Sequence, residues 1–344
     1  MRRLASLAVM LCALFLGPMT GGAWAAEPAA KPYRIYMALW RGWEDAAQGF
    51  KDYFANQGIP VELIIRDAGQ DKEKLKEFVA EAKSLQVDLV FTWGTTVTEE
   101  MLGRYDDPDK QSHITKIPAV FAIVSQPLGG VVPSLVSSGR NITGTTYLVP
   151  METQVNLIQS YRPLKRLGMV FNPLERNSQV AVEQLTSIGH SMGFDLVALP
   201  VDVAEGKPRP ASIALKVAEL KAARVDFIYI PPDTFLNINR DLLTQAALDH
   251  GIPTFAAAEN PVVTSKAMFG GVYRYYTVGQ LTAYKAEQIL VHKMAPGDIP
   301  IDAPKRLSVL INMPVVRQLG LFPPMKLLGL AEVIDRAEGK EIKP

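Results

Sequence analysis

The chain contains two similar halves, and this repeat limits what it can fold into. In each half a Val-Asp pair opens an apolar run, a polar stretch follows, and an Ile-Pro pair opens a second apolar run. The matching segments are 58–67 with 193–202, 83–96 with 221–234, 117–121 with 252–256, and 125–127 with 259–261. A repeat of this length is a whole lobe and not a solenoid unit. The sequence therefore predicts two similar α/β lobes, and a cleft between them in which function should lie.

Apolar runs alternate with amphipathic segments through both halves. The expected strands are residues 33–39, 61–65, 88–92, 119–123, 141–145, 168–171, 195–199, 226–230, 254–256, 269–273 and 306–311. The expected helices are residues 44–57, 72–85, a helix from 95, 152–161, 178–192, 211–222, 234–249, 278–292 and 314–319. This alternation is typical of parallel sheets that carry helices on both faces. We expect an α/β fold of two doubly wound parallel-sheet lobes joined by several hinge crossovers.

The last part of the chain departs from the repeat, and we expect it to cross back between the lobes. Lobe one is expected to comprise residues 26–147 and about 274–304. Lobe two is expected to comprise residues 148–273 and about 305–330. Residues 331–344 are predicted to be a C-terminal tail that is frayed at its charged end.

Residues 1–25 have the pattern of a signal peptide. Arg2 and Arg3 precede the apolar run 4–16, and Ala23-Trp24-Ala25 provides a cleavage site. A retained membrane anchor is the alternative, but the run is shorter than the ~20 residues that a span needs. The single cysteine, Cys12, lies in this run without a lipoprotein motif, so the mature chain can form no disulfide. These features predict a soluble, periplasmic protein with no membrane insertion after cleavage.

The charge of the mature chain is balanced. Removal of Arg2 and Arg3 leaves 34 Lys and Arg residues against 35 Asp and Glu residues. No basic run or tail is present, which argues against nucleic acid and anionic membranes as partners. We expect a monomer.

Motifs for catalysis or metal binding are missing from the sequence. The four histidines, at 113, 190, 250 and 292, show no metal-ligand spacing. There is no G-x-S-x-G elbow, no P-loop and no G-x-G-x-x-G after the first strand. We therefore expect no enzyme activity, no cofactor and no metal site.

The best candidate site in the first half is the turn after the strand at 88–92. Ligands of doubly wound sheets bind beyond the carboxyl ends of the strands. Gly94 allows a close backbone approach, and Thr95 and Thr96 stand where a helix begins, with unpaired N–H groups. This combination suits a carboxylate. Thr95 also fits a purely structural role as a helix cap.

The matching turn in the second half offers an acid, Asp233, which could accept from the ammonium group of a zwitterion. Glu259, at the next strand end, is the other candidate acid. Asn172 and Ser178 follow an earlier strand and could donate to a ligand. Each of these side chains is equally suited to capping a helix, except Glu259, whose alternative is simple exposure to solvent.

Three tryptophans follow strands of the first half, at Trp40, Trp43 and Trp93. Core packing is the ordinary role of each, but three at one cleft edge would form a flat apolar wall. Ser125 and Gln126 lie in the loop after the fourth strand. We include all five residues in the predicted ligand site.

Several motifs together resemble the solute-binding components of ABC transporters, in the family that includes tryptophan- and tyrosine-binding proteins. The motifs are Gly49-Phe50-Lys51, the segment 88–96, Ser125-Gln126-Pro127, the segment 139–144, Asn172-Pro173 with Asn177-Ser178, Val278-Gly279, and Asn312-Met313-Pro314 with Leu319-Gly320. The resemblance implies a type I periplasmic-binding fold that holds a ligand in the hinge cleft. Such families often carry Asp-Pro where this chain has Gln126-Pro127, which puts an amino-acid specificity in doubt.

The sequence thus predicts a periplasmic receptor that closes around a small polar or zwitterionic ligand. An amino acid with an aromatic or aliphatic side chain is one possible ligand, and the partners implied by the resemblance are an ABC permease and its ATPase. A sensory protein that docks on a membrane receptor is the first alternative. An exported α/β enzyme is the second, but it would require a nucleophile and a base that the motifs do not provide.

Overall fold

The structure is a computed structural model that describes residues 31–335. The predicted signal peptide, residues 1–25, lies outside the described residues. Most of the described strands belong to two sheets, one in each lobe. None of the helices in the described part is long and apolar enough to cross a membrane.

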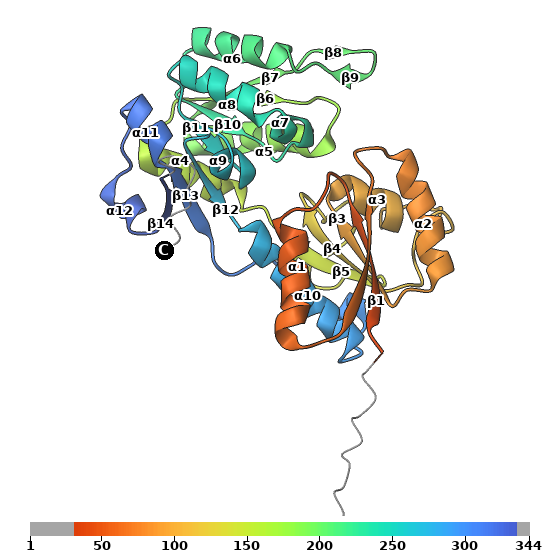
Figure 1. Ribbon diagram of the computed structural model, residues 1–344. Helices are drawn as coiled ribbons and strands as arrows, with labels where there is room; N and C mark the ends of the chain where they lie inside the picture. The colour runs from red at the N-terminus through yellow and green to blue at the C-terminus, as the bar shows by residue number, and fades with distance from the viewer. Residues whose placement is uncertain (1–30, 336–344) are drawn as a thin grey trace, which may run out of the picture. The chain divides into compact units, whose positions relative to one another are not determined.

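The sheet of lobe one has five parallel strands in the order β2-β1-β3-β4-β5. Its strands are β1 (Tyr33–Leu39), β2 (Val61–Asp67), β3 (Leu89–Trp93), β4 (Ala119–Val124) and β5 (Ile142–Thr146). Its helices are α1 (Asp45–Gln57), α2 (Glu73–Leu85), α3 (Thr95–Leu102) and α10 (Tyr275–Leu290). Helices α1 and α10 lie against one face of the sheet and α2 and α3 against the other (Figure 1). The central strands β3 and β4 are buried throughout because helices cover both faces.

The sheet of lobe two has seven strands in the order β14-β13-β12-β11-β10-β6-β7. Its strands are β6 (Arg166–Phe171), β7 (Asp195–Pro200), β10 (Phe227–Ile230), β11 (Thr254–Ala256), β12 (Phe269–Val272), β13 (Ser308–Asn312) and β14 (Ala331–Ile334). Its helices are α4 (Met151–Tyr161), α5 (Arg176–Met192), α6 (Ser212–Ala222), α7 (Thr234–Ile238), α8 (Arg240–Asp249), α9 (Asn260–Val263), α11 (Met313–Leu319) and α12 (Met325–Leu328). The two-stranded hairpin β8 (Val203–Ala204) and β9 (Lys207–Pro208) stands apart from this sheet.

Five strands of the second sheet repeat the order of the first. The series β7-β6-β10-β11-β12 is parallel throughout and corresponds, strand for strand, to β2-β1-β3-β4-β5. Strand β13 then pairs antiparallel to β12, and β14 pairs parallel to β13. The predicted α/β fold of two doubly wound lobes is confirmed, with this pair of strands added at one edge of lobe two.

The chain passes between the two sheets three times: between β5 and α4, between β12 and α10, and between residue 302 and β13. The first and third passages are tied together. Thr145 pairs with Asp302 in an isolated parallel bridge. The buried Lys285 donates from Nζ to the carbonyls of Gly144 and Pro300, both at 2.7 Å, and to Asp302 Oδ1 at 2.5 Å. The predicted crossovers are therefore present, and the Lys285 side chain links the first passage to the third.

Helices α1 and α10 pack backbone against backbone in lobe one. A Cβ atom added to Gly49 would lie 2.1 Å from the carbonyl oxygen of Tyr276. A Cβ atom added to Gly279 would lie 2.0 Å from the carbonyl oxygen of Ala46. Because α10 directly follows the second passage between the sheets, these two glycines fix the returning chain to lobe one.

The structure departs from the predicted elements at several places. The helix expected at 234–249 is divided into α7 and α8 at Asn239, whose side-chain Nδ2 donates to the carbonyl of Phe235. This local hydrogen bond competes with the helical pattern. Helix α10 begins at Tyr275, three residues before the expected start. The short elements α9, α12, β8, β9 and β14 were not predicted, and β14 lies in the segment 331–344 that the sequence analysis treats as a tail.

Candidate functional site

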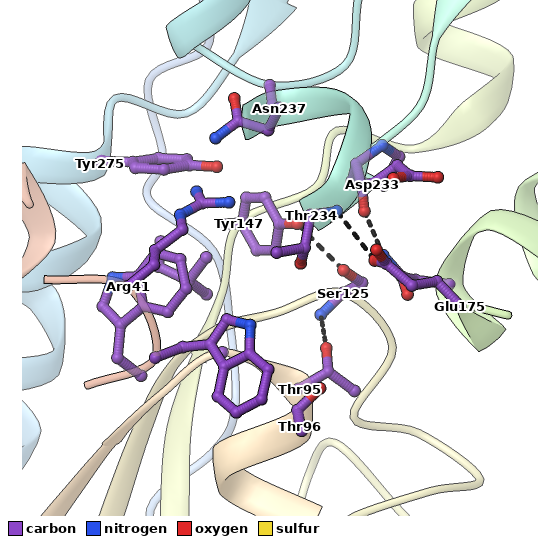
Figure 2. A pocket seen from close by; sticks show the side chains of 17 residues that line it. Arg41, Thr95, Thr96, Ser125, Tyr147, Glu175, Asp233, Thr234, Asn237 and Tyr275 are labelled. Atoms are coloured by element: carbon purple, nitrogen blue, oxygen red, sulfur yellow. Dashed lines mark hydrogen bonds between the residues drawn. The ribbon is translucent and has the colours of Figure 1, made fainter. Parts of the chain in front are cut away.

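A cavity that is partly open to solvent lies at the carboxyl ends of β1, β3, β4 and β10. Its walls come from both lobes (Figure 2). The lining residues of lobe one and its crossovers are Trp40, Arg41, Trp93, Gly94, Thr95, Thr96, Ile123, Ser125, Tyr147 and Tyr275. Those of lobe two are Glu175, Asn177, Pro232, Asp233, Thr234, Asn237 and Ala258.

A bulge in β4 brings residues of this strand to the cavity. The register between β4 and β5 shifts between Phe121 and Val124, and Ile123 has a φ of 57°. A β-branched residue in this left-handed region is strained, and bulges with such strain are found beside functional sites. The bulge places Ile123 and Ser125 on the same cavity wall.

The start of α3 presents unpaired N–H groups to the cavity. Gly94 precedes the helix with a φ of 90°, and the Thr95 hydroxyl accepts from the Ser125 N–H at 3.1 Å. Within residues 31–335, no acceptor is hydrogen-bonded to the N–H groups of Thr95, Thr96 or Val97. A helix start with free amides attracts a negatively charged group.

Trp93 adds a further unpaired donor to this wall. Its side chain is only 3% exposed, and its indole Nε1 has no hydrogen-bond partner among the described residues. A buried polar atom without a partner is unfavourable by roughly 1–3 kcal/mol. A ligand in the cavity that offered an acceptor to Nε1 would therefore remove this unfavourable contribution.

Arg41 places a guanidinium group over the Trp93 ring, with the Cζ atom 4.8 Å from the ring centroid. Its Nε donates to Glu44 Oε1 at 2.8 Å. Its Nη1 and Nη2 each lie 3.0 Å from the Asn237 side-chain oxygen when the Asn237 amide takes the orientation in which its oxygen faces donors and its nitrogen faces acceptors. Burial acts to lower the pKa of Arg41, but the Glu44 carboxylate and the Tyr275 hydroxyl outweigh it and raise the pKa. The guanidinium is thus a fixed positive charge in the cavity.

Two tyrosines from the crossover regions complete this side of the site. The Tyr147 and Tyr275 rings meet edge to face, with centroids 5.7 Å apart, and the Tyr147 hydroxyl is 3.0 Å from Ser125 Oγ. Burial raises the pKa of Tyr147 to about 12 and that of Tyr275 well above its ordinary value. Both hydroxyls are therefore neutral near pH 7 and can donate a hydrogen bond.

Asp233 of lobe two accepts hydrogen bonds from donors of its own lobe. Its Oδ1 accepts from the Leu236 N–H at 2.8 Å, which caps α7. Its Oδ2 accepts from the Asn172 N–H at 2.9 Å and from Ser178 Oγ at 2.5 Å. Burial, together with the nearby Glu175 charge, raises the pKa of Asp233. This residue ties the ends of β6 and β10 to the starts of α5 and α7.

Glu175 also occupies the start of α7. Its Oε2 accepts from the Thr234 N–H at 2.8 Å (Figure 2). Its Oε1 accepts from the Phe235 N–H at 2.9 Å and from Asn172 Nδ2 at 3.2 Å. The first amides of α7, unlike those of α3, are therefore already paired with carboxylates of the protein.

The structure brings together seven of the predicted site residues: Trp40, Trp93, Gly94, Thr95, Thr96, Ser125 and Asp233 line the cavity. The other five lie elsewhere. Trp43 is 41% exposed and donates to Gln48, and Gln126 lines two adjoining cavities. Asn172 and Ser178 lie behind Asp233. Glu259 is buried outside the cavity, where it pairs with Arg274 at 2.7 Å and accepts from the Tyr275 N–H.

Ten lining residues were not predicted: Arg41, Ile123, Tyr147, Glu175, Asn177, Pro232, Thr234, Asn237, Ala258 and Tyr275. Arg41, Pro232, Thr234 and Ala258 stand next to predicted residues, so the strand-end rule already marked their loops. Tyr147 and Tyr275 lie beside the crossovers, which the repeat does not place. Within the described residues, no cluster of three His, Cys, Asp or Glu side chains could hold a metal ion.

The comparisons with known proteins agree with this architecture. A sequence profile of the family described as ABC transporter substrate binding protein matches residues 41–334. A relative named tyrosine-binding protein, from Clostridioides difficile strain R20291, is 21% identical over 276 residues, which cover 80% of this chain and 73% of the relative.

Two solved structures have a similar fold. One is described as an ABC domain in complex with L-Trp from Streptococcus pneumoniae, with a TM-score of 0.73 and 22% identity, covering 88% of this chain and all of the other. The second is a conserved domain protein from Vibrio cholerae O1 biovar El Tor, with a TM-score of 0.76 and 23% identity, covering 89% of this chain and all of the other. At this identity the likeness extends to the fold, which is that of type I periplasmic-binding proteins.

Proposed function

The chain belongs to the family of ABC transporter substrate-binding proteins, and we propose that it is an exported periplasmic receptor that delivers a small polar solute to an ABC importer. The observation that carries this proposal is the wall of unpaired donors in the cavity. Trp93 Nε1 and the first amides of α3 lack acceptors among the described residues. A ligand with an acidic group would supply them.

The position and the lining of the cavity support a small-molecule ligand. The cavity lies at the strand ends, where ligands of doubly wound sheets bind. An amino acid with an aromatic side chain is one candidate, by analogy with the relative named tyrosine-binding protein and with the similar structure in complex with L-Trp.

We further propose that the mature protein is a monomer whose partners are an ABC permease and its ATPase. Lobe one would comprise residues 26–147 and about 274–304, and lobe two residues 148–273 and about 305–330. We add β14 to lobe two because it pairs with β13. The three passages between the sheets would serve as the hinge.

A ligand of this site is expected to raise the melting temperature of the protein. A compound that binds only the folded state adds about 2.7 kcal/mol to the free energy of unfolding at a concentration 100-fold above its Kd. A thermal-shift screen should include amino acids, organic acids and sugars. The proposed function would be contradicted if no compound in such a screen produced a shift.

Thr96→Ala is expected to weaken binding of the identified ligand by ~1 kcal/mol, about fivefold, because one hydroxyl at the start of α3 is lost. Isothermal titration calorimetry measures the change. Thr115→Ala is the matched control, since Thr115 is exposed and outside the cavity. Equal affinities of Thr96→Ala and the wild type, with folding intact, would place the acidic group elsewhere.

A further inference from the structure

We propose that the ligand is an anion without a free ammonium group, such as an aromatic or aliphatic monocarboxylate, and that the site disfavours the corresponding amino acid. This inference rests on the proposed function and deepens it. It follows from the state of the hydrogen-bonding groups around the cavity: donors of lobe one lack acceptors, whereas the acids of lobe two are already paired.

Lobe one presents donors that need acceptors. Trp93 Nε1 is buried and unpaired, and the N–H groups at the start of α3 are unpaired within the described residues. Trp93, Thr95 and Thr96 line one cavity, and the Arg41 guanidinium lies over the Trp93 ring. An ammonium group can only donate, so it satisfies none of them, whereas a carboxylate offers about four lone-pair positions.

The two acids that line the cavity have little capacity left for an ammonium group. Asp233 accepts three hydrogen bonds and is only 2% exposed. Glu175 accepts from Thr234, Phe235 and Asn172, and Asn177 Nδ2 lies at 3.5 Å. Glu175 could bind an ammonium group only by releasing one of these donors, and Asp233 is shielded from the cavity by its burial. The carboxylates on this wall are thus already hydrogen-bonded to donors within lobe two.

The remaining nearby acids are also committed. Glu44 pairs with Arg41 at 2.8 Å, and Glu259 is buried outside the cavity against Arg274.

Glu99 lines an adjoining cavity that shares Thr95 and Ser125 with the main one. Arg104 and Arg176 line the same adjoining cavity, and Arg104 Nη1 is 3.4 Å from Glu99 Oε1. Glu99 is thus already paired with Arg104, and Arg176 adds a further positive charge to this cavity. No acid at either cavity is therefore free to hold the positive end of an amino acid.

Matched pairs of compounds test the inference by calorimetry on the purified mature protein. The pairs are L-phenylalanine with 3-phenylpropionate, L-tryptophan with indole-3-propionate, and L-leucine with 4-methylpentanoate, which differ only in the ammonium group. In at least one pair the acid should bind at least about tenfold more tightly than its amino acid, because the buried ammonium group would lack a partner.

Equal or tighter binding of the amino acids would overturn the inference and leave the proposed function intact. Failure of every acid to bind at millimolar concentration would also overturn it. The proposed function would be contradicted only if no compound in the broader thermal-shift screen raised the melting temperature either.

A second variant tests the position of the anion. Trp93→Phe keeps an aromatic side chain but removes Nε1, so it should weaken binding of the best acid about tenfold. Trp43→Phe is the matched control and should leave the affinity unchanged, because Trp43 is exposed and outside the cavity. Unchanged affinity in Trp93→Phe, with the wild-type melting temperature, would contradict the proposed anion position.

Discussion

Replacing Gly279 with alanine is expected to lower the free energy of unfolding by about 2 kcal/mol or more. The new Cβ atom would lie 2.0 Å from the carbonyl oxygen of Ala46 and 2.9 Å from the backbone nitrogen of Phe50. Because both contacts are backbone atoms, α1 and α10 must move apart, and overpacking of this kind costs about 1–3 kcal/mol or more. The gain in helix propensity, ~1 kcal/mol, offsets only part of the loss. Urea denaturation measures the difference.

Gly329→Ala is the matched control for this substitution. Gly329 has an ordinary φ of −67°, and its added Cβ atom would meet nothing closer than 4.0 Å. This variant should be as stable as the wild type or slightly more stable, because alanine restricts the unfolded chain. Equal stabilities of Gly279→Ala and Gly329→Ala would show that α1 and α10 are not held in backbone contact.

Replacing Asp233 with alanine is expected to destabilise the protein by about 3 kcal/mol. The change leaves the buried N–H groups of Asn172 and Leu236 without an acceptor, and each unpaired group costs about 1–3 kcal/mol. Asp233→Asn should fall between this variant and the wild type. Its amide keeps one acceptor oxygen but places an NH₂ group beside a donor.

Asp71→Ala is the control for loss of an ordinary capping acid. Asp71 is exposed and accepts only from the Glu73 N–H near the start of α2, so its loss should cost less than about 1 kcal/mol. A variant of Asp233 that retained the wild-type melting temperature but lost ligand affinity would instead assign this carboxylate to the ligand.

Most of the fold was predictable because hydrophobic periodicity and the internal repeat indicate the same elements. The strand at 33–39 was predicted with its observed bounds, and the observed ends of the buried strands β3 and β4 lie within one residue of their predicted ends. The break at Asn239 was not predictable from periodicity, since it spans a single residue, whose side chain donates to the carbonyl of Phe235. Strand β14 was missed because it is short and half-exposed, and pairing with β13 establishes it.

The candidate site was predictable only as far as the strand-end loops. These loops contain Thr95 and Asp233, and both line the cavity. Sequence reasoning could not distinguish a capping Asp233 from a ligand-binding one, because the outcome depends on Asn172 and Ser178, which approach it from another strand end. Tyr147 and Tyr275 were missed for a related reason: their position depends on where the chain passes between the sheets.

The distribution of tryptophan gives the protein a built-in optical reporter. The four tryptophans are residues 24, 40, 43 and 93, so beyond the predicted signal peptide every one belongs to lobe one. Trp40 and Trp93 line the cavity, and Arg41 covers the Trp93 ring, whereas Trp43 is exposed. Beyond the predicted signal peptide, tryptophan fluorescence therefore arises entirely from lobe one. A ligand that displaces Arg41 from the ring changes the emission of the buried pair, while water-soluble quenchers reach Trp43 first, so occupancy can be followed without any attached dye.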